Sequence, residues 1–382
     1  MGTIMPPSPE QHRPPQRSLI AVIDNMAGRR QALVNILKPY FRVVDHEDGD
    51  KAIAELKNSR PAAALVADRL PPLGGYEVVK RIRDTAGLER LPVILVAPNG
   101  GKTVQDGQRW CGADRLLVWP CHPSMALMVV SSMCSLHIER SWEALSPIPR
   151  LALKQTLLAF NGLTEAIHQG GDVDIGEIGQ ASTSLVAALN DNHCHLILDA
   201  VKDHDDYTYV HCLRVSAFLS LFGHITGLPQ SEQVLLATGG LLHDVGKIKI
   251  PYDVLNKAGQ LKDVEFDLIK THVESTVELL QRAPQIRKPI ITIASQHHEK
   301  LDGSGYPLGL SGTQLDDLAR MATIVDIFSA LTDRRTYKPA MDPELALNLM
   351  LEGMSRELDM RLLAIFRQAM LDAAVFAEPV YG

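Results

Sequence analysis

Short apolar runs alternate with amphipathic stretches in the first third of the chain. The runs are LIAVI, FRVV, AAALVA, PVILVA and DRLLVW, between residues 19 and 119. Each has the length of a buried strand, and the stretches between them carry apolar residues at helical spacing, except that the fourth is polar and poorly defined. Five strand–helix repeats in about 120 residues predict an α/β fold with a doubly wound, five-stranded parallel sheet, whose ligands bind at the carboxyl ends of the strands.

The pattern becomes purely helical further along the chain. An apolar helix is predicted from Ser124 to Arg140, and the prolines of SPIPR at residues 146–150 are expected to interrupt helical structure and form a linker. Helical spacing then predicts helices at 151–168, 175–189, 194–201, 209–225 and 232–242, continuing to about residue 376. We therefore predict a disordered tail over residues 1–17, a first domain over 18–122, a connecting helix and linker over 123–150, and an all-α domain over 151–382.

Composition narrows the class of protein. A length of 382 residues is too great for one ordinary core, and 46% hydrophobic with 22% charged residues is typical of a globular protein. The net charge of -7 argues against a nucleic-acid polymer as partner, so any phosphate ester must meet local positive charge. No run is apolar enough to cross a bilayer and no signal-peptide pattern opens the chain, so we expect a cytoplasmic protein with no membrane partner.

The first domain carries a partial phosphoryl-transfer motif. Asp24 follows the first strand, and the sequence LPPLGGYEVVKRIR follows the third. With the five strand–helix repeats, these features resemble the receiver domain of two-component response regulators over about residues 18–140. In that family a carboxylate at the end of the third strand accepts a phosphoryl group beside Mg²⁺. The resemblance places Ala67 at this acceptor position, Ala97 at the hydroxyl position and Trp119 at the lysine position.

We therefore expect no phosphoacceptor, because alanine supplies neither a nucleophile nor a metal ligand. If the loop after the third strand is one residue shorter, Asp68, adjacent to Ala67, is the acceptor, but the missing lysine and hydroxyl residue then stay unexplained. The domain is predicted to be a pseudo-receiver that controls the rest of the chain. Its expected partners are a second copy, through the helix at 124–140, and a diguanylate cyclase or another signalling protein. A buried position within the domain explains that apolar helix equally well.

Histidine is concentrated in the second domain, where nine of the 14 histidines lie between His193 and His298. The candidate metal-binding residues are His211, His243, Asp244, His272, His297, His298 and Asp326. Adjacent histidine and aspartate at the end of an apolar helix can both reach one ion, and imidazole with carboxylate suits divalent first-row metals. Seven groups exceed the needs of one ion, and a pair of ions is the arrangement used for in-line displacement at phosphorus.

Three motifs, LLHDVGKIKIP, HHEKLDGSGYP and DIFSALTDRRTYK, together resemble the HD-GYP family, a subset of HD-superfamily phosphohydrolases, over about residues 199–338. The resemblance implies an all-helical fold and hydrolysis of cyclic di-GMP to pGpG, GMP or both. It implies one metal ion on His211, His243, Asp244 and Asp326 and a second on Asp244, His272, His297 and His298. Asp244 is then the bridge. Iron or manganese is expected, with nickel or zinc as alternatives.

The resemblance also implies substrate contacts. Asp244 and Lys247 are the expected catalytic residues, and Lys247, Arg335 and Lys338 the expected phosphate contacts. The substrate loop comprises Gly303, Gly305, Tyr306 and Pro307. Arg214 is expected in a structural ion pair, and Glu299 and Asp302 either orient the histidines or form a solvated loop face.

The sequence departs from the family at several positions, among them HVEST at residues 272–276, where the family has HPxxG. A glutamate that precedes the first histidine is Tyr207 here, an aspartate that follows the last ligand is Ser329, and a proline is Thr336. All seven ligands remain, and the change at Tyr207 predicts two metal ions and not three. Two other functions stay open: a catalytically weak cyclic di-GMP receptor or protein-interaction module, and a hydrolase of another cyclic dinucleotide. The intact ligand set favours an enzyme, since a scaffold needs no metal ligands.

Overall fold

The computed structural model describes residues 18–168, 174–201, 208–255, 257, 259–284, 286–333 and 341–375. They form two compact units, which divide between His137 and Ile138. The tail predicted over residues 1–17 lies outside the described residues, and the other domain limits stay predictions. Within the described ranges, none of the helices has the length and apolar character that a membrane span requires.

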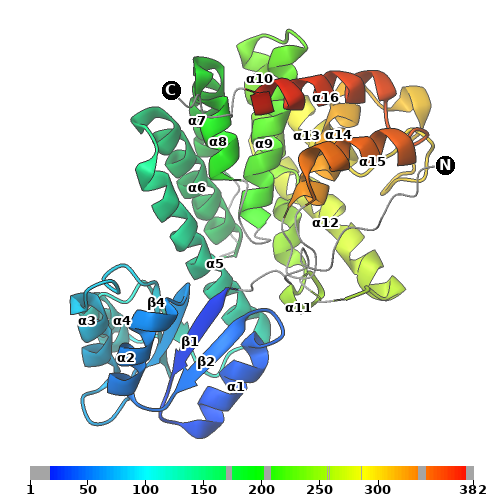
Figure 1. Ribbon diagram of the computed structural model, residues 1–382. Coiled ribbons are helices and arrows are strands. Elements are labelled where there is room, and N and C mark those ends of the chain that lie inside the picture. Colours follow the sequence, from blue (N-terminus) through cyan, green and yellow to red (C-terminus); the bar gives the residue numbers. More distant parts are fainter. Residues whose placement is uncertain are drawn as a thin grey trace, which may run out of the picture. The chain divides into compact units, whose positions relative to one another are not determined.

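The first unit is a parallel sheet with helices (Figure 1). Its elements are β1 (Leu19–Ile23), α1 (Ala27–Leu37), β2 (Arg42–His46), α2 (Gly49–Ser59), β3 (Ala63–Ala67), α3 (Gly75–Asp84), β4 (Val93–Ala97), α4 (Lys102–Cys111), β5 (Arg115–Val118) and the first part of α5 (Pro123–Ser141). The strand order is β2-β1-β3-β4-β5, and all neighbours pair in parallel. This is the flavodoxin-like, doubly wound order. The predicted α/β fold class is confirmed.

Burial follows position in the sheet. β3 and β4 are buried at every residue, whereas β2 and β5 at the two edges are largely half-buried or exposed. In Figure 1, α2, α3 and α4 gather on one side of the strands and α1 lies on the other. The polar segment that periodicity left undefined forms α4, where Cys111 is the buried residue.

The second unit is helical. Its elements are the end of α5, η2 (Trp142–Ala144), α6 (Pro147–His168), α7 (Gly176–Ala188), η3 (Leu189–His193), α8 (Cys194–Ala200), α9 (Thr208–Ile225), α10 (Gln230–Leu242), η4 (Val245–Lys249), α11 (Tyr252–Leu255), α12 (Asp263–Gln281), α13 (Lys288–Gln296), η5 (Gly312–Gln314), α14 (Asp317–Thr332), α15 (Pro343–Gly353) and α16 (Met360–Val375). The expected linker at SPIPR is wrong in detail. Pro147 opens α6, because proline at the start of a helix loses no hydrogen bond, and the interruption lies between Ser141 and Pro147.

Aromatic packing fixes two of the helices that carry candidate ligands. The rings of Phe218 on α9, Phe328 on α14 and Phe366 on α16 lie with their centroids 5.2 to 6.1 Å apart, edge to face. Such ring pairs add specific geometry to the burial of apolar area. They hold α9 and α14 against one core, with Phe218 seven residues after His211 and Phe328 two residues after Asp326.

A glycine allows a further close approach. A Cβ atom on Gly246 in η4 would lie 2.2 Å from the carbonyl oxygen of His272 and 2.5 Å from the backbone nitrogen of Thr276. Only glycine therefore lets η4 lie directly on α12. This contact brings the end of α10 next to His272.

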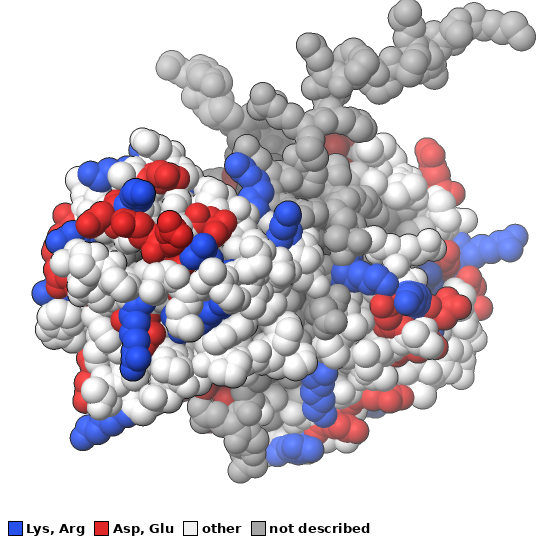
Figure 2. All heavy atoms as spheres, turned by 90° about the horizontal axis from the view of Figure 1, so that it is seen from below, with Lys and Arg blue, Asp and Glu red and all other residues white. Residues whose placement is uncertain are grey.

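Charged side chains are mixed on the surface. On the face seen in Figure 2, Lys and Arg lie among Asp and Glu, and the residues described there form no continuous basic area. The absence of a nucleic-acid partner stays a prediction.

Candidate metal centre

All seven predicted metal-binding residues lie together in the helical unit. His211 comes from α9, His243 and Asp244 follow α10, His272 lies on α12, His297 and His298 follow α13, and Asp326 lies on α14. All are buried except His298, which is half-buried. Five helices separated in sequence therefore converge on one polar cluster inside an apolar core.

Asp244 lies between two groups of histidines. Its Oδ2 atom is 3.2 Å from Nε2 of His243 and 3.6 Å from Nε2 of His211. Its Oδ1 atom is 3.1 Å from Nε2 of His272 and 3.9 Å from Nε2 of His297. The two carboxylate oxygens thus face different histidines, as a bridging ligand requires.

Asp326 joins the first group. Its Oδ1 atom is 3.0 Å from Nε2 of His211 and 3.8 Å from Nε2 of His243, and its Oδ2 atom is 3.5 Å from Nδ1 of His298. Ligand atoms of His211, His243 and Asp326 all lie within 4.8 Å of one another, and the same is true of Asp244, His272, His297 and His298. The second set is the one expected from the sequence, and the first contains three of the four residues expected for the other ion. Metal binding by these residues stays a prediction.

The residues fit divalent metal ions. Nε2 of His243 and Oδ1 of Asp244 are buried and lie 3.2 and 3.1 Å from other ligand atoms, but neither makes a hydrogen bond of good geometry. An unsatisfied buried polar atom costs about 1–3 kcal/mol, and coordination to a metal removes that cost. Oxygen and nitrogen donors of this kind suit iron, manganese, nickel or zinc.

Burial and charge set the protonation of the ligands. Burial lowers the pKa of His298 to about 3, and burial with the neighbouring His298 lowers the pKa of His297 well below its usual range. Burial alone would raise the pKa of Asp244, but the charges of Lys247 and His243 outweigh it and hold that pKa well below normal. Neutral imidazole and ionised carboxylate are the forms that bind metal, and the shifts at Asp244, His297 and His298 favour them. Burial lowers the pKa of His211 and His243 as well, but neighbouring carboxylates outweigh it and raise both pKa values.

Three of the histidines are oriented by backbone. In His243, His272 and His297 the Nδ1 atom faces the carbonyl oxygen three residues earlier, at 2.8, 2.6 and 3.1 Å. A donor bond from Nδ1 leaves Nε2 for the metal. His211 differs, since its Nδ1 atom lies 2.9 Å from Oδ2 of Asp333.

The predicted phosphate contacts are only partly described. Nζ of Lys247 lies 2.5 Å from Oδ2 of Asp244, which places its positive charge at the metal centre. Arg335 and Lys338 lie outside the described residues, as do Tyr207 and Thr336. Their roles stay predictions.

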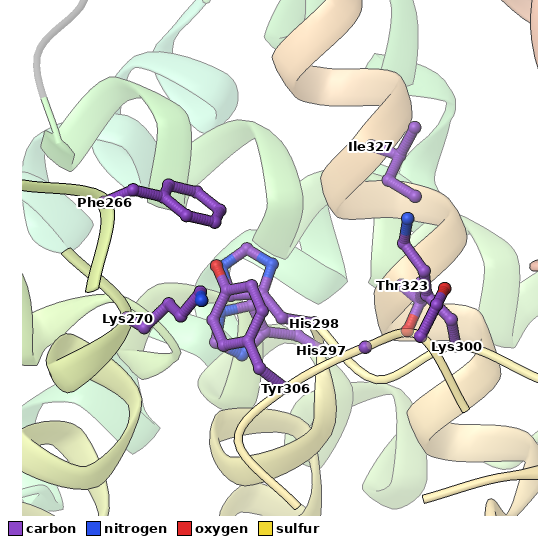
Figure 3. A pocket seen from close by; sticks show the side chains of 10 residues that line it. Phe266, Lys270, His297, His298, Lys300, Tyr306, Thr323 and Ile327 are labelled. Atoms are coloured by element: carbon purple, nitrogen blue, oxygen red, sulfur yellow. The ribbon is translucent and has the colours of Figure 1, made fainter. Parts of the chain in front are cut away.

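A pocket of about 250 Å³ opens beside the histidines (Figure 3). It is lined by Phe266, Lys270, His297, His298, Lys300, Ser304, Gly305, Tyr306, Thr323 and Ile327. The Tyr306 ring lies over the His298 ring with centroids 4.6 Å apart, and Nζ of Lys270 lies 4.6 Å from the Phe266 ring centroid. Aromatic faces and an ammonium group beside a metal centre suit a ligand with both a planar ring and a phosphate.

Sequence reasoning missed Phe266 and Lys270. They lie four residues apart on α12, the helix that carries His272, so helical spacing was the available signal.

Glu299 anchors the loop that contains Gly303, Gly305, Tyr306 and Pro307. This side chain is 1% exposed and accepts hydrogen bonds from the backbone N–H groups of Leu308 at 2.7 Å and Leu310 at 2.9 Å. The expectation that Glu299 orients the histidines or faces solvent is therefore wrong, because the side chain points at loop backbone.

Gly305 and Asp302 in the same loop differ in their surroundings. A Cβ atom on Gly305 would lie 2.5 Å from the carbonyl oxygen of His298, so glycine is required there. Asp302 is exposed and accepts from Ser304, in agreement with a solvated loop face.

The first unit holds a separate acidic pair. Asp24, which follows β1, is buried and pairs with Arg29, whose Nη2 atom is 3.2 Å from Oδ1. Nη1 of Arg29 lies 3.7 Å from Oδ1 of Asp68, which follows β3. A guanidinium thus lies beside both carboxylates at this edge of the sheet.

The other receiver positions lie at strand ends, as the sequence predicted. Ala67 is the last residue of β3, Ala97 is the last residue of β4, and Trp119 follows β5. The absence of a phosphoacceptor stays a prediction.

The fold and site together define a helical domain with a buried cluster of histidines and aspartates that could hold metal ions. Residues 194–362 match the family model described as "HD domain". This part of the chain is similar to HD domains.

Three relatives extend the comparison. The cyclic di-GMP phosphodiesterase PA4108 of Pseudomonas aeruginosa is 36% identical over 157 residues, 41% of this chain and 38% of that protein. The cyclic di-GMP phosphodiesterase response regulator RpfG of Xanthomonas campestris is 27% identical over 347 residues, 90% of this chain and 85% of that protein. The 3'3'-cGAMP-specific phosphodiesterase 2 of Vibrio cholerae is 37% identical over 156 residues, 40% of this chain and 30% of that protein. The chain therefore spans less than half of two relatives and most of RpfG.

Proposed function

We propose that this chain is a metal-dependent phosphodiesterase of the HD-GYP type that hydrolyses cyclic di-GMP to pGpG, GMP or both. The observation that carries the proposal is Asp244, whose two oxygens face two separate sets of histidines. The proteins named cyclic di-GMP phosphodiesterases among the relatives support the same substrate. Iron or manganese is the proposed metal, with nickel or zinc as alternatives.

The chain's own residues have distinct tasks in this proposal. His211, His243, Asp244 and Asp326 would hold one ion, and Asp244, His272, His297 and His298 the other. Bound divalent ions would make water nucleophilic at neutral pH and withdraw charge from the phosphoryl oxygens. Lys247 adds positive charge beside Asp244, where a phosphate oxygen can accept a hydrogen bond from Nζ.

Further residues bind the rest of the substrate. Arg335 and Lys338 are proposed as additional phosphate contacts, the arginine through a bidentate grip. Tyr306, Phe266 and Lys270 line the pocket beside His298 and would receive a base or ribose of the dinucleotide.

A second substrate is a specific alternative. The relative from Vibrio cholerae named as specific for 3'3'-cGAMP is as similar to this chain as PA4108 is. A hydrolase of another cyclic dinucleotide therefore stays the second candidate.

Metal analysis and product separation test the proposal. The full chain, loaded with iron or manganese under reducing conditions, is incubated with cyclic di-GMP or with 3'3'-cGAMP, and products are separated by ion exchange. We expect two metal ions per chain and release of pGpG or GMP from cyclic di-GMP. Faster turnover of 3'3'-cGAMP would favour the second candidate, and two bound ions without turnover of either would favour a receptor.

Two variants provide the controls. Asp244→Ala should abolish both metal loading and hydrolysis, because it removes the shared ligand. Asp359→Ala is the matched control, since Asp359 is a half-buried aspartate of the helical unit that pairs with Arg320 at 2.9 Å. It should retain both properties.

We also propose that the first unit regulates the enzyme without being phosphorylated. The ion pairs of Arg29 with Asp24 and Asp68 support this, because they already neutralise the carboxylates. Incubation with acetyl phosphate and Mg²⁺, followed by mass spectrometry, should leave the mass unchanged. A phosphoryl adduct on Asp68 that persists during the assay and is lost in acid would contradict regulation without phosphorylation. Dimerisation through residues 124–140 and a signalling partner stay predictions, the first testable by sedimentation.

A further inference from the structure

His211 is held differently from the other buried histidines of the centre. A metal-binding imidazole needs its second nitrogen fixed, because that bond sets the tautomer and the direction of the first nitrogen. His243, His272 and His297 use the carbonyl oxygen of their own preceding turn. His211 instead meets a carboxylate from another helix, with Nδ1 2.9 Å from Oδ2 of Asp333.

Asp333 is itself fixed on several sides. It is 7% exposed, and its Oδ1 atom lies 2.7 Å from Nε of Arg214, which is 4% exposed. Nη2 of Arg214 donates to the hydroxyl of Thr332 at 2.7 Å. The backbone N–H of Asp333 donates to the carbonyl of Ser329 at 2.7 Å. The carboxylate is therefore held in one place before any metal binds.

The same helix holds both nitrogens of the His211 ring. Asp326 lies on α14, and Asp333 directly follows the last residue of that helix. The two aspartates are seven residues apart, which is two helical turns, so they lie on the same side of the helix. Asp326 faces Nε2 at 3.0 Å and Asp333 faces Nδ1 at 2.9 Å. Ser329, one turn before Asp333, lies 3.4 Å from Nδ1 of His211 and 3.4 Å from Nε of Arg214.

We propose that Asp333 is a positioning residue of the metal centre, which accepts the Nδ1 proton of His211 and directs Nε2 toward the metal with Arg214 as its anchor. The inference rests on the proposed metal centre. Ser329 stands where the resembled family has an aspartate, and it faces the same two groups. The orienting carboxylate of this chain comes from one turn further along α14.

The experiment moves the carboxylate back by one turn. Binding of Mn²⁺ to the metal-free full chain is followed by the electron paramagnetic resonance signal of free Mn²⁺, for the parent, Asp333→Ser, Asp333→Ser with Ser329→Asp, and Asp333→Asn. We expect Asp333→Ser to weaken one of the two sites by about 10–100-fold, the usual effect of losing such an outer partner. Adding Ser329→Asp should recover most of the affinity, because its carboxylate reaches both His211 and Arg214.

Asp333→Asn covers the case in which the serine variant does not fold. Asparagine keeps an oxygen for Nδ1 but loses the charge that pairs with Arg214, so its affinity should fall between those of the parent and the serine variant. Asp359→Ala is the control. It removes an ion pair with Arg320 and no contact to the proposed ligands, so it should bind Mn²⁺ with the affinity of the parent.

The outcomes are distinct. Unchanged Mn²⁺ affinity in folded Asp333→Ser, or no recovery in the folded double variant, would overturn the positioning role and leave the phosphodiesterase proposal intact. A parent chain that binds no Mn²⁺ would overturn both.

Discussion

Replacing Glu299 by glutamine tests whether the substrate loop is held by a buried carboxylate. Each carboxylate oxygen accepts one backbone N–H, from Leu308 at 2.7 Å and from Leu310 at 2.9 Å. Glutamine has the same shape but only one acceptor oxygen, so its amide group must face the second N–H. One charge-assisted bond is lost and a buried donor is left unsatisfied, which together cost about 3 kcal/mol.

Urea unfolding of the helical unit measures this loss. Trp142 is 1% exposed in its core, whereas Trp110 and Trp119 belong to the first unit. In a Trp110→Phe, Trp119→Phe background, fluorescence therefore reports the helical unit alone. Glu299→Gln should lower its free energy of unfolding by about 3 kcal/mol and raise KM more than it lowers kcat, since the loop lines the pocket.

Glu357→Gln is the matched control. Glu357 contacts Lys300 at 2.5 Å but is partly exposed, and such pairs contribute about 0–1 kcal/mol. If Glu299→Gln costs no more than this control, the two backbone bonds do not hold the loop and the reasoning is refuted.

Three further predictions concern packing, pH and metal. Gly246→Ala places a Cβ atom 2.2 Å from the carbonyl oxygen of His272, so Mn²⁺ titration should show weakened binding and thermal unfolding a loss of about 1–3 kcal/mol. Burial opposes a low pKa at Asp359, but the backbone N–H of Leu362 and Arg320 outweigh it and lower the pKa below its model-peptide value of 3.8. The stabilisation is therefore present above that value and lost as pH falls through the lower folded pKa. The difference in urea midpoint between the parent and Asp359→Asn should shrink from about pH 7 to about pH 3, and a constant difference would contradict the charge effect. Chelation of the metals should lower Tm, because an ion at 100 times its Kd stabilises by about 2.7 kcal/mol, and an unchanged Tm would argue against tight sites.

The clustering of the seven candidate ligands could be predicted because they occur in short, specific motifs. The pairs at His243 and His297 are adjacent in sequence, and a helix end delivers both members to one place. The fold class followed from strand runs that are buried on both faces.

Residues that act across the fold were not predictable in this way. Asp333 meets His211 across 122 positions of sequence, only because α9 and α14 pack on one core. Glu299 lies in a polar loop sequence, and nothing local distinguishes a buried carboxylate from a solvated one. The start of α6 at Pro147 shows the same limit, since proline both interrupts and begins helices.

The C-terminal ends of α10 and α13 lie at the cluster of candidate ligands and affect its attraction for cations. Each helix ends next to a histidine that we propose as a metal ligand, His243 after α10 and His297 after α13. Their backbone dipoles therefore present the negative pole to the cluster, an effect of about 0.3–1 kcal/mol for each helix. No side-chain substitution removes this contribution, so a variant such as Asp244→Ala, which should no longer hold metal, should still attract a protonated neighbour such as Lys247 to the site.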